Sequence, residues 1–315
     1  MAAPRVFGTL EVIDAQVHLN QLLPHWRTAG LDEAVEAGVQ AMDAVGIDRV
    51  LIGEVHGLDE DYRLIGELLP NGAIRTSRPF SERAVEMYPD RFAYYALVDP
   101  LDPDLDTVTQ QIASRPGAGG LRIIPLLETG EVARLERGEY DSLFAAAERY
   151  NMPVFAWVPS RAAMLVPYAE KFSNLQLIVD HTGVGAAPLR SGRELPATTA
   201  SSLTEALADR IEEFARVCEM ARCPNIWLKW SHAPMLLTEA DYPYADLLPL
   251  LRQAIDAFGA ERIMWASDYT IARLENGNSW AQCLYYLLDS DELSRGEKEW
   301  ILGGSVRRVL DWPRG

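Results

Sequence analysis

Eight short runs rich in apolar and β-branched residues recur along the 315-residue chain, and most are separated by segments with helical spacing. The runs cover residues 11–19, 49–55, 92–99, 120–125, 153–158, 175–181, 225–231 and 262–268. Strands that alternate with helices form parallel sheets whose faces the helices cover. Eight such units close into a (β/α)8 TIM barrel, for which about 250 residues is typical. A doubly wound open sheet obeys the same alternation and is the alternative fold.

Two of the intervening segments illustrate the helical spacing. Apolar residues at positions three and four apart run through 35–45 and again through 247–258. Gly46 and Gly259 follow directly, and glycine is the residue that most often ends a helix. We therefore expect helices over both segments. We also expect one domain over residues 1–315, because no composition break divides the chain, with the Gly-, Pro- and Ser-rich stretch 182–203 as an active-site loop or lid.

Composition restricts the partners of such a barrel. Acidic residues outnumber basic ones by 46 to 29, and the formal net charge of −17 disfavours nonspecific binding to nucleic acid or to an anionic membrane. The three cysteines form no CxxC pair, so neither a disulfide framework nor a cysteine zinc site is indicated. The N-terminal stretch MAAPRVFGTLEV has no apolar core of signal-peptide length, and no segment approaches the roughly 18 uninterrupted apolar residues of a membrane span. We expect a soluble cytoplasmic protein that acts on a small molecule. Because closed twofold assemblies are the commonest oligomers, we expect a homodimer.

Histidines gather where the predicted strands end. All five lie at or just after such an end: His18, His25, His56, His181 and His232. The catalytic groups of TIM barrels lie at the carboxyl ends of the strands, so this placement indicates a functional cluster. Side chains alternate along a strand, which puts Asp14, Gln16 and His18 on one predicted face. If such faces point inward, His18, His181 and Asp268 converge.

Two basic residues interrupt apolar strands. Arg122 lies in GGLRIIP and Lys229 in NIWLKWSHAP. In a chain with net charge −17, cations inside strands are suited to hold an anion or a developing oxyanion. Their alternative role is to pair with an inward carboxylate such as Asp14 or Asp268.

Six segments also carry a resemblance to a known family: VIDAQVHL, GLRIIP, VDHTG, NIWLKWS, ERIMWASDYT and the closing GGSVRRVLDW. Together they resemble the amidohydrolase superfamily, in its amidohydrolase-related branch (amidohydrolase 2). More narrowly, they are similar to the lactonase group that includes 2-pyrone-4,6-dicarboxylate lactonase, L-fuconolactonase and L-rhamnonolactonase. The resemblance spans nearly the whole chain and implies a TIM barrel that hydrolyses a carboxylic ester.

The resemblance also implies a metal set, from which this chain departs. The superfamily uses His-x-His on the first strand, one His each on the fifth and sixth strands, and an Asp on the eighth. His181 and Asp268 match, but Gln16 replaces the first imidazole and Trp157 aligns with the fifth-strand histidine. An amide is a poor zinc ligand and an indole offers no lone pair. We therefore favour a site without metal, as the pyrone dicarboxylate subgroup has; the alternative is one zinc or manganese ion on His18, His181 and Asp268.

Lactone hydrolysis without a metal needs a general base, stabilisation of the oxyanion and a proton for the leaving oxygen. By resemblance, we assign Asp268 as the base. The other predicted site residues fall into three groups: carbonyl polarisation by His18, His181 and Gln16, binding of an anionic substrate by Arg122 and Lys229, and specificity by His232, His56 and Trp157.

Three other functions stay open for the same residues. A metal-dependent hydrolase or decarboxylase of the same superfamily would use His18, His181 and Asp268 as ligands. A barrel without catalysis that binds a small acidic ligand would tolerate both Gln16 and Trp157. An isomerase or dehydratase would need only acid and base residues. The identity of the lactone does not follow from the sequence.

Overall fold

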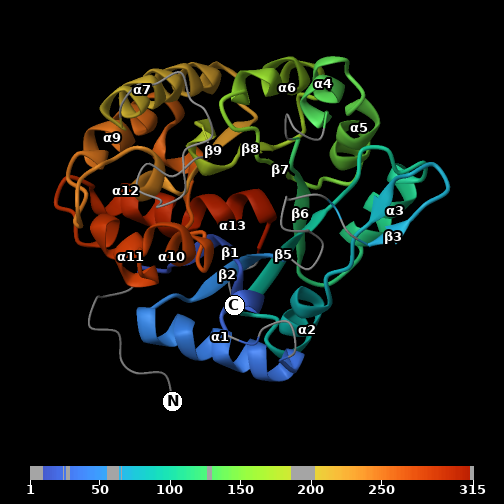
Figure 1. Cartoon of the computed structure of the whole chain (residues 1–315), viewed down its shortest axis with the longest axis horizontal. Coiled ribbons are helices and arrows are strands. Elements are labelled where there is room, and N and C mark those ends of the chain that lie inside the picture. Colours follow the sequence, from blue (N-terminus) through green and yellow to red (C-terminus); the bar gives the residue numbers. More distant parts are fainter. Residues whose placement is uncertain are drawn as a thin grey trace.

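The computed structural model describes residues 10–23, 25, 29–54, 64, 66–125, 130–185 and 203–312. Eight parallel strands form one sheet in the order β1-β2-β5-β6-β7-β8-β9-β10 (Figure 1). They are β1 (Ile13–Val17), β2 (Arg49–Gly53), β5 (Phe92–Leu97), β6 (Ala118–Ile123), β7 (Val154–Ala156), β8 (Leu177–Val179), β9 (Ile226–Trp230) and β10 (Ile263–Trp265). Seven of the eight predicted runs contain one of these strands, and the run 120–125 overlaps β6, which begins at Ala118.

The first and last strands meet and bring the sheet round into a barrel. Val17 forms a parallel bridge with Tyr269, and the Asp268 backbone N–H donates to the Gln16 carbonyl at 3.0 Å. The strands are therefore arranged in chain order around a (β/α)8 TIM barrel, as expected. A doubly wound sheet would instead reverse its strand order part-way across, so that alternative is wrong.

Helices cover the outside of the barrel. They are α1 (Leu31–Val45), α2 (Pro79–Met87), α3 (Leu105–Ala113), α4 (Glu131–Glu136), α5 (Asp141–Arg149), α6 (Val166–Lys171), α7 (Leu203–Glu219), α8 (Ala233–Leu236), α9 (Leu247–Phe258), α10 (Ile271–Asn276), α11 (Trp280–Leu288), α12 (Arg295–Glu299) and α13 (Ser305–Leu310). Shorter helical turns are η1 (Leu19–Gln21), η3 (Ala162–Leu165), η4 (His181–Gly183), η5 (Met220–Arg222), η6 (Ala260–Arg262) and the π-helix η7 (Trp300–Gly304). As predicted, α1 ends at Gly46, whose φ of 87° is left-handed, and α9 ends at Gly259.

The core has two parts. The larger lies between the strands and the surrounding helices. The smaller fills the barrel with side chains from its strands, such as Leu51, Phe155 and Trp227, and α13 adds Val306 and Val309 to it. The last helix, red in Figure 1, thus packs on the inner core. A filled barrel leaves the carboxyl ends of the strands as the place for a site.

A small hairpin is inserted between β2 and α2. Its strands β3 (Glu67–Leu68) and β4 (Ile74–Arg75) are antiparallel and form a separate two-stranded sheet, beside α3 in Figure 1. Strands of two residues leave no alternation to detect, so the sequence did not indicate them. Within the predicted loop 182–203, residues 186–202 lie outside the described part of the chain. Among the helices that the structure describes, none combines the length and the apolar character that a membrane crossing needs.

Candidate active site

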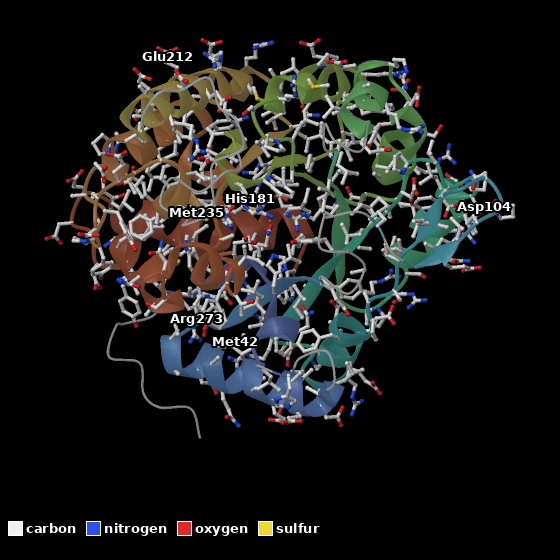
Figure 2. All side chains as sticks on the ribbon, viewed as in Figure 1. Met42, Asp104, His181, Glu212, Met235 and Arg273 are labelled. Carbon is white, nitrogen blue, oxygen red and sulfur yellow. The ribbon has the colours of Figure 1, made fainter. Side chains whose placement is uncertain are left out.

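The predicted polar residues meet at the carboxyl ends of the barrel strands. Gln16 lies in β1 and His18 directly follows it, while His181, His232 and Asp268 follow β8, β9 and β10. All five are buried, with 0 to 8% of their surface exposed. Figure 2 shows His181 near the middle of the molecule, inside the ring of helices. The five side chains are therefore buried together at the carboxyl ends of the strands.

The backbone at three of these residues is left-handed. The φ angles of His181, His232 and Asp268 are 52°, 57° and 55°. Residues other than glycine rarely adopt this conformation, which costs about 1–3 kcal/mol where the surroundings enforce it. Such residues concentrate at functional sites. Here each follows a strand and turns the chain at the barrel mouth.

The carboxylate of Asp268 is the centre of the group. Its Oδ1 accepts hydrogen bonds from the amide of Gln16 and from His18 Nε2, the latter at 2.9 Å. Its Oδ2 is hydrogen-bonded to His232 Nε2. Burial alone would raise the pKa of Asp268, but the neighbouring imidazoles of His232, His18 and His181 hold it well below 3.8. Asp268 is therefore ionised at neutral pH.

His18 connects this carboxylate to the second strand. Its Nδ1 lies 2.5 Å from the carbonyl oxygen of Gly53, at the end of β2. Both ring nitrogens face acceptor oxygens, so hydrogen bonds to both require a hydrogen on each nitrogen. The ring is thereby fixed in orientation and directed at Asp268.

His181 is held by the neighbouring strand. Ser231 Oγ accepts the backbone N–H of His181 at 3.1 Å and lies 2.9 Å from its Nδ1. If the Ser231 hydroxyl donates to Nδ1, the ring hydrogen lies on Nε2; if Nδ1–H donates to Ser231 Oγ, Nε2 is an acceptor. Burial, together with the positive neighbours His232, Arg122 and Lys229, lowers the pKa of His181 well below 6.5. His181 is thus a neutral imidazole whose Nε2 faces the site, 3.4 Å from Gln16 Nε2 and 3.4 Å from Arg122 Nη2.

The two basic residues are bridged by a carboxylate that sequence reasoning missed. Lys229 Nζ lies 2.6 Å from Asp180 Oδ1, and Arg122 Nε lies 3.1 Å from Asp180 Oδ2. Neither cation pairs with Asp14 or Asp268, the carboxylates expected in that role. The signal for Asp180 was present, since it ends the apolar run LIVD just before His181, as Asp268 ends its own run.

Lys229 reaches the site through another side chain. Its ammonium is fully buried and donates to Gln16 Oε1 at 2.9 Å. Burial lowers its pKa to about 8, against the opposing effect of Asp180. Arg122 extends further: Nη1 donates to the Tyr95 hydroxyl at 2.9 Å, and Nη2 lies 3.4 Å from His181 Nε2. Binding of a substrate anion by these two residues stays a prediction.

The side chains of Asp14 and Gln16 contact different groups, although the predicted alternation placed them on one face of the strand. Its carboxylate accepts from the backbone of Ser267 at 2.9 Å, from Trp280 Nε1 at 2.7 Å and from the backbone of Gln16 at 3.1 Å. The pairing of β1 with β2 shifts register between Asp14 and Val17, so alternation fails there. Burial raises the pKa of Asp14 to about 6, although hydrogen bonds from Ser267 and Trp280 oppose that rise.

Comparison with known proteins places the chain in a family. A family model described as Amidohydrolase matches residues 73–312. The chain belongs to the amidohydrolase family. An L-fucono-1,5-lactonase of Burkholderia ambifaria is 32% identical to it over 170 residues, which cover 50% of this chain and 49% of that protein. The match therefore spans about half the length of that relative.

Solved structures share the fold of this amidohydrolase at low identity. A putative 2-pyrone-4,6-dicarboxylic acid hydrolase of Pseudomonas putida superposes with a TM-score of 0.69 at 16% identity, covering 98% of this chain and 100% of that one. An amidohydrolase of Burkholderia multivorans with bound zinc gives 0.65 at 18% identity, covering 96% and 100%. At these identities the likeness concerns the fold.

Three side chains of the site are arranged so that they could bind a metal ion. Donor atoms of His181, His232 and Asp268 lie within 4.8 Å of one another, all buried. Two imidazoles and a carboxylate are a known donor set of catalytic zinc, so the composition fits a divalent ion. The ligand set predicted from the sequence contained His18 where this group has His232. His18 Nε2 contacts Asp268 Oδ1. His232 was predicted to determine specificity, and its direct contact with Asp268 was not foreseen.

Of the remaining predicted residues, Trp157 contacts the site and His56 lies outside the described part of the chain. Trp157 follows β7, and its ring centroid is 5.7 Å from that of His181 in an edge-on contact. The side chain of His25 is more than half exposed, and its Nε2 lies 3.6 Å from Glu33 Oε1.

Proposed function

We propose that this amidohydrolase opens the cyclic ester of a small, anionic lactone, with Asp268 as the general base on water and with no metal ion. The observation that carries the proposal is the Asp268 carboxylate, ionised and oriented by His18 and His232 beside the neutral imidazole of His181. The likeness to a lactonase over half the chain supports the ester as the bond that breaks.

The reaction divides among these groups in two steps. A water oxygen attacks the lactone carbonyl carbon while Asp268 removes its proton. The carbonyl oxygen becomes an oxyanion that accepts hydrogen bonds from His181 Nε2–H and Arg122 Nη2, which face the same space 3.4 Å apart. The tetrahedral intermediate then collapses, the ring C–O bond breaks, and Asp268 returns the proton to the departing oxygen. The product is a hydroxy acid.

Independence from metal rests on what replaces the missing imidazoles. The amide nitrogen of Gln16 donates to Asp268, and its amide oxygen accepts a hydrogen bond from Lys229. Gln16 therefore links the cation of Lys229 to the carboxylate of Asp268. Trp157 occupies the position after β7 with no donor lone pair. When bound to His181, His232 and Asp268, a divalent ion would supply a water of lowered pKa. This donor group favours a second candidate, a metal-dependent hydrolase or decarboxylase.

Arg122 supports an anionic substrate. Its Nη2 lies 3.4 Å from Nε2 of His181, the proposed oxyanion donor. Its counter-charge is the carboxylate of Asp180, which also pairs with Lys229. Two cations on one carboxylate leave one positive charge at this end of the site. A substrate carboxylate or the developing oxyanion would complete the balance.

The test is a lactone panel assayed with purified protein in the presence and absence of chelator. We expect hydrolysis of at least one sugar lactone or pyrone carboxylate, unchanged by chelation. Asp268→Asn should reduce kcat by at least about 10²-fold, the lower end for a general base, while the exposed His25→Ala leaves it unchanged. Loss of activity on chelation, with recovery on adding zinc or manganese, would establish the second candidate. Saturable binding without turnover of any compound would instead indicate a barrel that only binds its ligand.

A further inference from the structure

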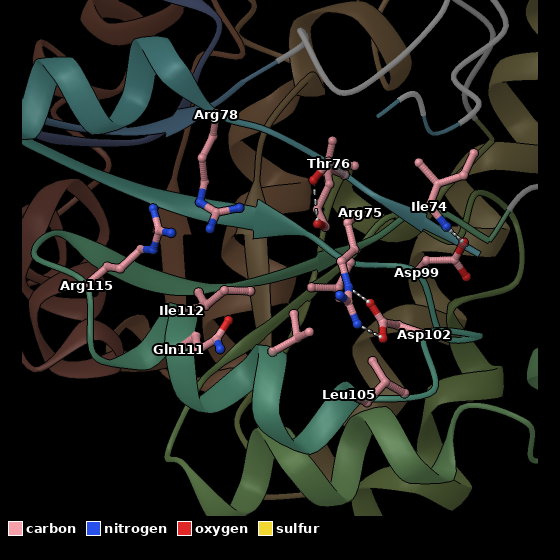
Figure 3. Close-up of a pocket in the computed structure, with 13 residues that line it drawn as sticks. Ile74, Arg75, Thr76, Arg78, Asp99, Asp102, Leu105, Gln111, Ile112 and Arg115 are labelled. Atoms are coloured by element: carbon pink, nitrogen blue, oxygen red, sulfur yellow. Dashed lines mark hydrogen bonds and ion pairs between the residues drawn. The ribbon is translucent and has the colours of Figure 1, made fainter. Parts of the chain in front are cut away.

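A cavity of about 130 Å³ lies on the flank of the barrel, between the segment that joins β4 to α2 and helix α3 (Figure 3). We call it the flank pocket. Its lining combines apolar and charged side chains: Ile74, Arg75, Thr76, Arg78, Leu97, Val98, Asp99, Asp102, Leu105, Val108, Gln111, Ile112 and Arg115. It shares no lining residue with the Asp268 group. The flank pocket is thus a second hollow with charges of its own.

The acidic groups at one end of the flank pocket are already paired. Arg75 binds Asp102 through Nε at 2.7 Å and Nη2 at 2.9 Å, and Nη2 also reaches Asp104 at 2.8 Å. Asp99 accepts the backbone N–H groups of Ile74 and Leu101 at 2.8 and 2.9 Å. This end holds three carboxylates and the one guanidinium of Arg75, so it carries an excess of negative charge and an anion would bind at the other end.

The other end has two guanidinium groups and one carboxylate between them. Arg78 Nε lies 3.4 Å from Glu82 Oε1, and Arg115 Nη1 contacts the same oxygen. Arg78 Nε is buried and makes no hydrogen bond with any part of the chain that the structure describes. Figure 3 shows both guanidinium groups extending into the pocket, from opposite walls. One positive charge therefore remains without a negative partner of its own.

A buried hydroxyl stands beside these cations. The Arg78 guanidinium carbon lies 5.8 Å from the ring centroid of Tyr94, whose side chain is fully buried. Burial raises the pKa of Tyr94, while the charge of Arg78 and a hydrogen bond with it oppose that rise. An anion is the ligand that would serve the two guanidinium groups that line the flank pocket.

The apolar part of the lining indicates which kind of anion fits the flank pocket. Six of the lining residues are aliphatic: Ile74, Leu97, Val98, Leu105, Val108 and Ile112. A volume of about 130 Å³ has room for about four water molecules at about 30 Å³ each, or for a short acid. Inorganic phosphate would leave the aliphatic wall uncovered.

We propose that the flank pocket binds a small aliphatic carboxylate, with its carboxylate on Arg78 and Arg115 and its alkyl chain on Val108 and Ile112. Arginine favours carboxylates because its planar fork donates two parallel hydrogen bonds. This site is independent of the function proposed for the barrel mouth.

Calorimetric titration of the whole protein with butyrate tests the proposal, with n-butanol and n-butylamine as matched compounds that lack the negative charge. We expect saturable binding of butyrate alone. Arg78→Gln and Arg115→Gln should each weaken it at least about tenfold, as expected when a charged hydrogen bond is lost. Arg115 is half exposed, so its variant keeps a test available if Arg78→Gln does not fold.

Two controls separate the flank pocket from other sites. Arg137→Gln removes an exposed arginine that pairs with Glu139 away from the pocket, and it should bind butyrate as the unaltered protein does. Asp268→Asn should also keep the affinity, which separates this binding from any at the barrel mouth. The proposal is overturned by absence of saturable butyrate binding, by equal binding of butylamine, or by unchanged affinity in both Arg78→Gln and Arg115→Gln.

Discussion

Lys229 Nζ lies 2.9 Å from Gln16 Oε1, which places a fully buried ammonium behind the amide that stands where the sequence resemblance predicts a metal-binding imidazole. A positive charge on the amide oxygen polarises the group, so its NH2 becomes a stronger donor. That NH2 donates to Asp268. The positive charge of Lys229 is thereby transmitted to the proposed base without direct contact, and this relationship leads to two predictions.

The first prediction is a loss of activity at alkaline pH. Burial lowers the pKa of Lys229 to about 8, so the ammonium loses its charge as the pH rises through that value. Gln16 then loses its charged donor and Asp180 loses a partner, and kcat/KM should fall above about pH 8. Lys229→Arg cannot lose its proton in this range, so a folded Lys229→Arg variant should lack this limb. An identical limb in that variant would assign the titration to another group.

The barrel itself could be predicted because its signals are local. Each strand is a contiguous apolar run, and the helix ends at Gly46 and Gly259 depend on single residues. Partners across the barrel are different. The pairing of Lys229 with Asp180 depends on how the strands are staggered, and both candidate carboxylates named from the sequence were wrong.

Two local departures were also hidden from the sequence. The register shift in β1 separates Asp14 from Gln16, although their spacing of two residues predicts a shared face. The left-handed backbone at His232 turns its ring onto Asp268, a direction that a residue after a strand does not reveal. The sequence thus indicated which residues gather but left open the atoms that they contact.

The second prediction restores the missing imidazole. Gln16→His adds a nitrogen donor beside His18 and His181, whose Nε2 atoms both lie 3.4 Å from the present amide nitrogen. We expect zinc to bind at least about tenfold more tightly than to the unaltered protein. Titration under a competing chelator measures this. Gln16→Asn is the matched control, because it keeps an amide and should gain no affinity. Equal zinc affinity in all three proteins would mean that the family position does not face the donor group.

A third prediction concerns the hydroxyl that fixes His181. Ser231→Ala removes the partner of Nδ1, so the ring hydrogen that the proposed mechanism needs on Nε2 is no longer directed there. We expect kcat to fall about 10- to 100-fold, as for other groups that orient a catalytic histidine, with KM changed much less. Ser231→Thr retains a hydroxyl and should recover most of the loss. A fall in KM alone, or no recovery with threonine, would point to packing as the role of Ser231.

The fourth prediction concerns stability, through the buried carboxyl of Asp14. Because burial raises its pKa to about 6, the folded protein holds this proton more tightly than the unfolded chain, whose value is near 3.8. Stability from this group is therefore present in full below about pH 4 and is lost as the pH rises through about 6. Each pKa unit corresponds to about 1.4 kcal/mol, and most of the change falls between about pH 4.5 and 7.5, where we expect about 2 kcal/mol.

Comparison with Asp14→Asn isolates this contribution from the other carboxylates, since asparagine does not titrate. Urea unfolding of both proteins should show the free energy of unfolding of the unaltered protein falling relative to the variant by about 2 kcal/mol from about pH 4.5 to 7.5. The variant itself should be less stable at the lower pH, because its NH2 group would face the donors of Ser267 and Trp280. A difference that stays constant with pH would mean that Asp14 keeps an ordinary pKa, in which case its four hydrogen-bond donors outweigh its burial.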